Sequence, residues 1–148
     1  MSSAPVALID TLNSLLEAEQ TNIFRFMGEG YPYLNRATVD VRLPLQEMVK
    51  TIDRRAAQLA DQIEALGGVP NFGPFGVDRE EQYLAFLSLK FLLPKLLQAK
   101  KLLIERYENA VRSMRESGAK SLVVSLLEEH REQLKTLEVA ATRVATQK

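Results

Sequence analysis

The segment LNSLLEAEQTNIF, residues 12–24, spaces its apolar side chains three or four positions apart, which is the period of an amphipathic helix. Extended in both directions, the apolar stripe contains Ile9, Leu12, Leu16, Ile23 and Phe26. Glu19 falls on the same stripe. A carboxylate on a buried face must be paired, hydrogen-bonded or bound to a metal. The segment therefore predicts a helix with one charged residue on its inner face.

A second helix is predicted before Gly67 and Gly68, which are typical helix-ending residues. Its apolar stripe contains Leu45, Met48, Ile52, Ala56, Leu59, Ile63 and Leu66. Arg55 lies between stripe residues, as Glu19 does in the first helix. The start of this helix has two interpretations. Pro44 is either in the first turn, or it kinks a helix that begins near Thr38.

Two more helices are predicted on either side of Ser117 and Gly118. The third follows the glycine- and proline-rich segment GGVPNFGPFGV, residues 67–77, and should be kinked near Pro94. The fourth has a stripe that also includes His130. Its apolar members are Val123, Leu127, Leu134, Leu137, Ala141 and Val144. Four helices of similar length predict an all-α antiparallel four-helix bundle, formed as a single domain by residues 1–148, with a long loop between helices two and three.

Composition excludes several classes of protein. Lysine and arginine equal aspartate and glutamate at 19 each, so the basic surface of a nucleic-acid-binding protein is not expected. The absence of cysteine excludes disulfides and thiolate ligands. The most apolar stretch, residues 83–104, contains four lysines and a proline, so we expect no membrane span. The first residues lack the basic start of a secretory signal, which favours a cytoplasmic location.

Three features resemble the bacterioferritin- and rubrerythrin-type proteins of the ferritin-like superfamily. Residues 12–24 look like their first helix, in which a glutamate at the position of Glu19 ligates a di-iron centre. The segment LADQIEALGGVPN, residues 59–71, is similar to the end of their second helix and the following turn. His130 matches the place of their second ligating histidine. The resemblance implies a ferritin-like bundle built around a di-iron site.

The same resemblance identifies the site as degenerate. Residues other than metal ligands occupy the remaining ligand positions, namely Ile52, Arg55, Pro94 and Leu127. Between Glu81 and Glu105 the third helix has no aspartate or glutamate, and the whole chain has one histidine. A complete di-iron centre within one chain is therefore excluded.

We expect a core polar cluster of Glu19, Arg55 and His130 in place of the metals, because a guanidinium can pair with a carboxylate and supply the missing positive charge. In the alternative interpretation, Arg55 extends to the surface and Glu19 bonds a hydroxyl or water. No cofactor is expected. A single iron or zinc held by Glu19 and His130 is the remaining metal alternative, although two protein ligands are too few for a closed zinc site.

The third helix is apolar on more faces than one core can cover, which indicates a partner surface and favours a homodimer. The candidate interface residues are Tyr83, Phe86, Leu87, Phe91 and Leu92. These features favour a non-catalytic, dimeric scaffold or interaction module, a pseudo-enzyme of the ferritin-like type. The alternatives are an iron-binding oxidase or iron-storage protein with a residual or interfacial metal site, and a carrier of a small apolar ligand. The sequence does not identify a protein partner, a ligand or a biological process.

Overall fold

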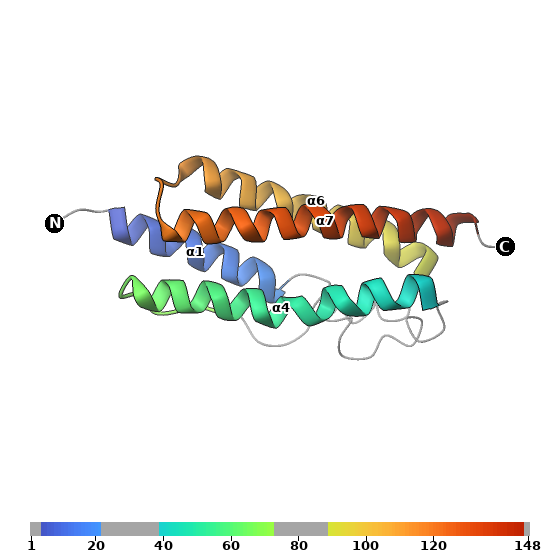
Figure 1. Ribbon diagram of the computed structural model, residues 1–148, viewed down its shortest axis with the longest axis horizontal. Coiled ribbons are helices and arrows are strands. Elements are labelled where there is room, and N and C mark those ends of the chain that lie inside the picture. The colour runs from blue at the N-terminus through green and yellow to red at the C-terminus, as the bar shows by residue number, and fades with distance from the viewer. Residues whose placement is uncertain (1–3, 22–38, 73–88, 147–148) are drawn as a thin grey trace.

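The computed structural model describes residues 4–21, 39–72 and 89–146. Within these ranges every regular element is a helix, and the chain forms α1 (Ala4–Thr21), α4 (Val39–Ala65), α6 (Leu89–Ser113) and α7 (Gly118–Thr146). The four helices lie along one common axis, as Figure 1 shows. The predicted all-α four-helix bundle is thereby confirmed.

The order of the helices in space differs from their order in the chain. α1 packs on α4, α4 on α7, α7 on α6, and α6 on α1. In Figure 1, α4 and α6 run in the same direction, whereas α1 and α7 run in the opposite one. Every pair of packed neighbours is therefore antiparallel. The end of α4 and the start of α6 lie at opposite ends of the bundle, which explains why the link between them is long.

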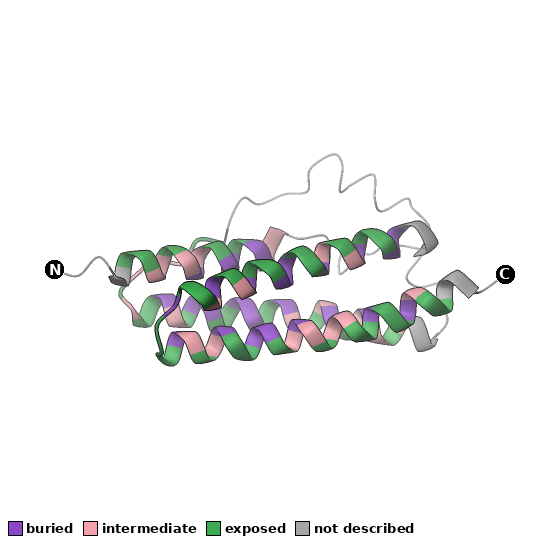
Figure 2. Ribbon diagram, turned by 90° about the horizontal axis from the view of Figure 1, so that it is seen from above, coloured by how far each residue is buried: buried purple, intermediate pink, exposed green. Residues whose placement is uncertain are grey.

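The described parts of the predicted apolar stripes form much of the core, whereas Ile23 and Phe26 lie outside the described residues. Leu12, Leu16, Leu59 and Ile63 are completely buried, and Figure 2 shows the buried positions recurring along each helix on the side that faces its neighbours. Val123, Leu127 and Leu137 of α7 are buried as well. Burying such aliphatic side chains stabilises the fold by about 1.5–3 kcal/mol each. The three-four periodicity thus located the inner face of the bundle.

Both glycines after α4 have a structural reason. Gly67 has a φ of 85°, and its N–H donates to the carbonyl of Glu64 at 2.9 Å. The Gly68 N–H donates to the carbonyl of Ile63 at 2.9 Å, which completes a Schellman motif. A Cβ on Gly68 would lie 2.7 Å from Cγ2 of Ile9, so this glycine also allows α1 to approach closely. The predicted end of the second helix is confirmed.

Two prolines lie inside helices. α4 is already helical at Val39, so Pro44 is an internal residue and the second interpretation of the start of this helix applies. Pro94 lies inside α6, and the kink near it stays a prediction. Between α6 and α7, the hydroxyl of Ser117 accepts a hydrogen bond from the Lys120 N–H at 3.2 Å and caps α7.

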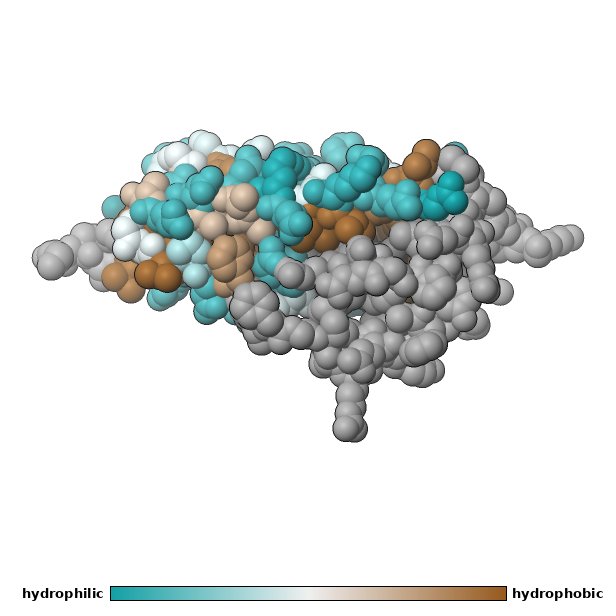
Figure 3. All heavy atoms as spheres, turned by 90° about the horizontal axis from the view of Figure 1, so that it is seen from below, coloured by the Kyte–Doolittle hydropathy of each residue, from teal (hydrophilic) through white to brown (hydrophobic). Residues whose placement is uncertain are grey.

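The described surface is mostly polar. Hydrophilic side chains cover most of the described part of the face in Figure 3, and hydrophobic ones form small separate groups. The exposed large apolar residues are scattered over the helices and the segment after α4: Val6, Leu43, Val69, Phe72, Leu102, Val124 and Val139. No helix in the described ranges is long and apolar enough to cross a membrane.

The residues predicted to form a dimer interface lie largely beyond what can be described. Tyr83, Phe86 and Leu87, together with the side chain of Phe91, fall outside the described residues. Leu92 is only 1% exposed and packs in the interior of the bundle. Its burial places it on the inner face of α6, so it does not contribute to an outer apolar face in the single chain.

Candidate functional site

Four polar or charged side chains are buried among the described residues, and each comes from a different helix. They are Glu19 of α1, Arg55 of α4, Lys100 of α6 and His130 of α7, all exposed by no more than 1%. Removing a charge from water costs several kcal/mol unless partners replace the lost hydration. The four residues must therefore satisfy one another, and their contacts define the candidate site.

Glu19 receives hydrogen bonds from the three other helices. Nε of Arg55 donates to its Oε1 at 3.0 Å, and the Tyr107 hydroxyl donates to the same oxygen at 2.6 Å. Nε2 of His130 lies 2.6 Å from this oxygen as well. An ionised carboxylate only accepts hydrogen bonds, so Nε2 carries the proton and donates. Charge-assisted bonds of this kind are the stronger ones in proteins.

Further hydrogen bonds connect His130 to Arg55 through other side chains, so that the contacts form a closed network. Nζ of Lys100 lies 3.1 Å from Nδ1 of His130 and donates to Oε1 of Gln133 at 2.8 Å. Nε2 of Gln133 donates to Oγ1 of Thr51 at 2.9 Å, and Nη1 of Arg55 donates to the same hydroxyl at 2.7 Å. We call this closed network the polar ring. Its members, in order, are Glu19, His130, Lys100, Gln133, Thr51 and Arg55.

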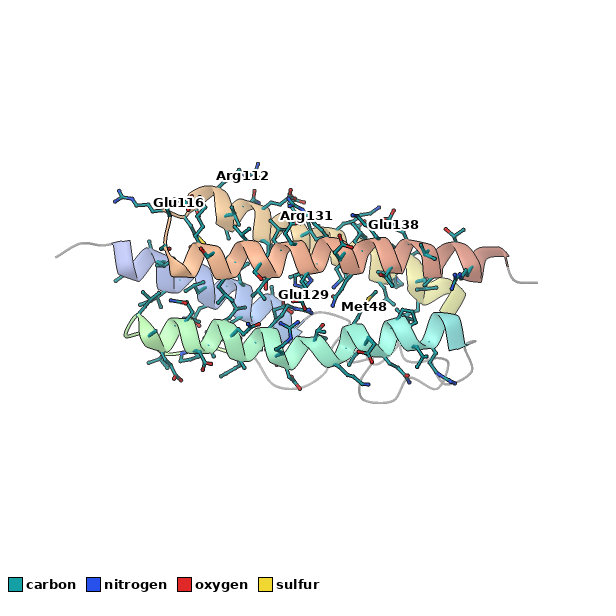
Figure 4. All side chains as sticks on the ribbon, in the orientation of Figure 1. Met48, Arg112, Glu116, Glu129, Arg131 and Glu138 are labelled. Atoms are coloured by element: carbon teal, nitrogen blue, oxygen red, sulfur yellow. The ribbon has the colours of Figure 1, made fainter. Side chains whose placement is uncertain are left out.

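Glu129 connects the polar ring to solvent between α4 and α7. Its Oε1 accepts a hydrogen bond from Nη1 of Arg55 at 2.9 Å and also contacts the guanidinium of Arg54. The side chain of Glu129 is 26% exposed and that of Arg54 is 49% exposed. Figure 4 shows Glu129 projecting from α7 toward α4. Arg55 therefore lies between two carboxylates, the buried Glu19 and the partly exposed Glu129.

Burial and neighbouring charges set the protonation states. Burial alone would raise the pKa of Glu19, but the hydrogen bond from His130 and the positive charge of Arg55 outweigh it and lower that pKa to about 2. Burial lowers the pKa of His130 to about 4 against the attraction of Glu19. Burial and repulsion by Arg55 lower the pKa of Lys100 to about 7. Burial and the nearby Glu19 raise the pKa of Tyr107. At neutral pH, Glu19 is thus a carboxylate and His130 is neutral.

The structure brings together the three residues of the expected core polar cluster, Glu19, Arg55 and His130. Ile52 and Leu127, two of the lost-ligand positions, are buried apolar residues. The third helix differs from the expectation that Pro94 occupies one of the lost-ligand positions.

Pro94 of the third helix is exposed, because it lies on the outer side of α6. Lys100 is instead the residue of α6 that reaches the polar ring.

Sequence reasoning missed Lys100 and Tyr107, although the sequence contains a signal for both. They lie in one three-four stripe of α6 whose members are Leu96, Lys100, Leu103, Tyr107, Ala110 and Met114, all buried. A lysine in an apolar stripe is the same pattern that singled out Glu19 and Arg55. The neighbouring Lys101 is exposed, and a pair of lysines in a helix is typical of a solvated face.

The side chains of the polar ring do not fit a di-iron site. Among the residues that the structure describes, no group of three or more His, Asp or Glu side chains is arranged to hold a metal ion. Oε1 of Glu19 and Nδ1 of His130 are occupied by donors, and two of those donors are the cations Arg55 and Lys100. A metal ion would have to enter beside these two positive charges.

The four helices form an antiparallel bundle, and comparison with solved structures shows that this bundle has a ferritin-like fold. The chain is similar to the bacterioferritin-related protein of Bacteroides fragilis, described as a dodecameric thioferritin, with a TM-score of 0.72 and 22% sequence identity. The match covers 95% of this chain and 88% of the other. No protein-family model and no curated protein sequence matches the chain.

Proposed function

We propose that this chain is a non-catalytic ferritin-like bundle that acts as a self-associating scaffold or interaction module, with the polar ring in place of a metal centre. The observation that carries the proposal is the closure of the ring on side chains of all four helices. Each helix contributes a member, so the ring links the whole bundle through side chains of the chain itself.

Electrostatics support the non-catalytic assignment. The guanidinium of Arg55 and the ammonium of Lys100 supply the positive charge that balances Glu19 and Glu129. A divalent ion in the same place would be repelled by the Arg55 guanidinium and, below the Lys100 pKa of about 7, by the Lys100 ammonium. Leaving a buried charge without its partner costs about 3–5 kcal/mol. The ring therefore opposes metal-based oxidation or peroxide chemistry at this position.

Two observations support self-association. The structurally similar bacterioferritin-related protein is described as dodecameric. The apolar segment that includes Tyr83, Phe86, Leu87 and Phe91 has more apolar side chains than one core requires. Because the described surface has only scattered apolar residues, we assign the interface to this segment. A homodimer formed through it is the simplest closed assembly.

The test combines metal content, ferrous iron oxidation and molar mass on protein purified without a tag or chelator. We expect far less than one metal ion per chain, no oxidation of ferrous iron above buffer, and a particle mass of at least twice 16.6 kDa by light scattering. Iron near two per chain would overturn the non-catalytic assignment. A strictly monomeric particle would overturn the scaffold assignment.

An interface variant provides a matched comparison. Phe86→Asp should reduce the particle mass, whereas Val139→Asp, at a 52% exposed position of α7, should leave it unchanged. Both substitutions replace an apolar residue by the same charge, so a difference between them reports the location of the interface. Equal masses for both variants and the wild type would place the interface elsewhere.

A further inference from the structure

Both ring nitrogens of His130 are engaged, and the chemistry of the partners determines where its proton lies. Nδ1 faces the Lys100 ammonium at 3.1 Å, and Nε2 faces Oε1 of Glu19 at 2.6 Å. An ammonium has three donors and no acceptor, whereas a carboxylate has only acceptors. A neutral imidazole satisfies both neighbours in one way only. Nδ1 accepts from Lys100, and Nε2–H donates to Glu19.

The opposite tautomer would be unfavourable at both contacts. An N–H on Nδ1 would point at the N–H groups of Lys100, and the lone pair on Nε2 would face the lone pairs of the Glu19 carboxylate. The imidazole is also held by the ring of Tyr107, whose centroid lies 4.9 Å away, and it is completely buried. The buried charged residue of α4, Arg55, donates to Glu19 and not to the imidazole.

We propose that Lys100 prevents divalent metal ions from binding to His130, because its ammonium occupies the lone pair of Nδ1 and thereby fixes the proton on Nε2. A metal ion binds an imidazole nitrogen only through its lone pair. With Lys100 in place, neither nitrogen offers one. The proposal goes beyond the loss of ligands at positions such as Leu127, since it assigns metal exclusion to one residue that the structure places in contact with the imidazole.

Removing Lys100 should open a binding site of defined chemistry. Without the ammonium, the lone pair of Nδ1 loses its donor, and so does Oε1 of Gln133, which accepted from the same ammonium. An imidazole nitrogen and an amide oxygen that have both lost this donor can ligate a first-row divalent ion such as Co²⁺ or Zn²⁺. The groups that orient a ligating histidine change metal affinity about 10- to 100-fold. Lys100 also orients the histidine, but it lowers the metal affinity instead of raising it.

The experiment uses the single histidine of the chain, so every imidazole signal in a nitrogen-15 NMR spectrum belongs to His130. Spectra are recorded between the pKa values of His130, about 4, and Lys100, about 7, where the imidazole is neutral and the ammonium is charged. In the wild type we expect a protonated Nε2 and an unprotonated Nδ1. Adding Co²⁺, which is paramagnetic, should leave these signals unchanged.

Lys100→Met removes the charge and the donor while keeping a side chain of similar length. In this variant Co²⁺ should shift or broaden the His130 signals in a saturable way, at concentrations at least about tenfold below any that affect the wild type. Lys101→Met, which removes the same charge from an exposed position, and Lys100→Arg, which keeps a donor, should behave like the wild type. Lys100→Leu is a second apolar replacement if Lys100→Met does not fold.

The outcomes separate this inference from the proposed function. A wild-type spectrum with the proton on Nδ1 would overturn the assignment of the tautomer without any variant. If folded Lys100→Met shows no change of the His130 signals with Co²⁺, the role of Lys100 is overturned and the proposed function is not affected. Wild-type protein that binds Co²⁺ at His130 as tightly as the variant would overturn both.

Discussion

Replacing Arg55 by alanine should cost the protein about 3 kcal/mol of unfolding free energy. Arg55 is 1% exposed and its partner Glu19 is completely buried. Breaking a buried ion pair by removing one member typically costs about 3–5 kcal/mol, because the other charge stays buried. We expect the lower end of this range, since Tyr107 and His130 still donate to Glu19 after the change. For a chain of this size the melting temperature should fall by about 6–12 °C.

Urea unfolding followed by circular dichroism measures this loss, and the adjacent Arg54 provides the control. Arg54 also contacts Glu129, but its side chain is 49% exposed. A surface pair of this kind contributes at most about 1 kcal/mol. If Arg55→Ala and Arg54→Ala lose the same small amount of stability, the buried pair does not support the fold as described. A double-mutant cycle with Glu19→Gln should assign most of the loss to the Arg55–Glu19 contact.

Two other changes test the polar ring. Tyr107→Phe removes the hydroxyl that donates to Glu19 at 2.6 Å and should cost about 1.5–3 kcal/mol in urea unfolding, and a loss below about 0.5 kcal/mol would contradict this bond. Stability should also depend on pH through Lys100, whose pKa is about 7 in the folded protein and 10.5 ordinarily. Between these values the unfolded chain holds more protons, so the unfolding free energy should rise from pH 7 toward pH 10 by at most about 1.4 kcal/mol per pH unit. Lys100→Met should lose this rise in a series of urea titrations, and a rise of equal slope in the variant would assign it to other groups.

The sequence alone determined the helices and their inner faces. Intervals of three and four residues located the buried stripes of α1, α4 and α7, and the glycine pair at the end of α4 predicted the turn that the structure forms there. These features depend on residues close together in the chain, because helical period and helix capping are local properties. A charged residue within an apolar stripe was also visible, which is why Glu19, Arg55 and His130 could be singled out.

Only the tertiary structure decided how those residues are satisfied. The partners of Glu19 come from positions 36, 88 and 111 residues away, and no local pattern specifies such pairings. Lys100 shows the difference most clearly. Its place on the stripe of α6 indicated burial, but a lysine beside Lys101 is equally typical of a solvated face. The packing of α6 against α7 brings its ammonium to the imidazole of His130. Because a buried cation must find an acceptor, that contact makes Lys100 part of the polar ring.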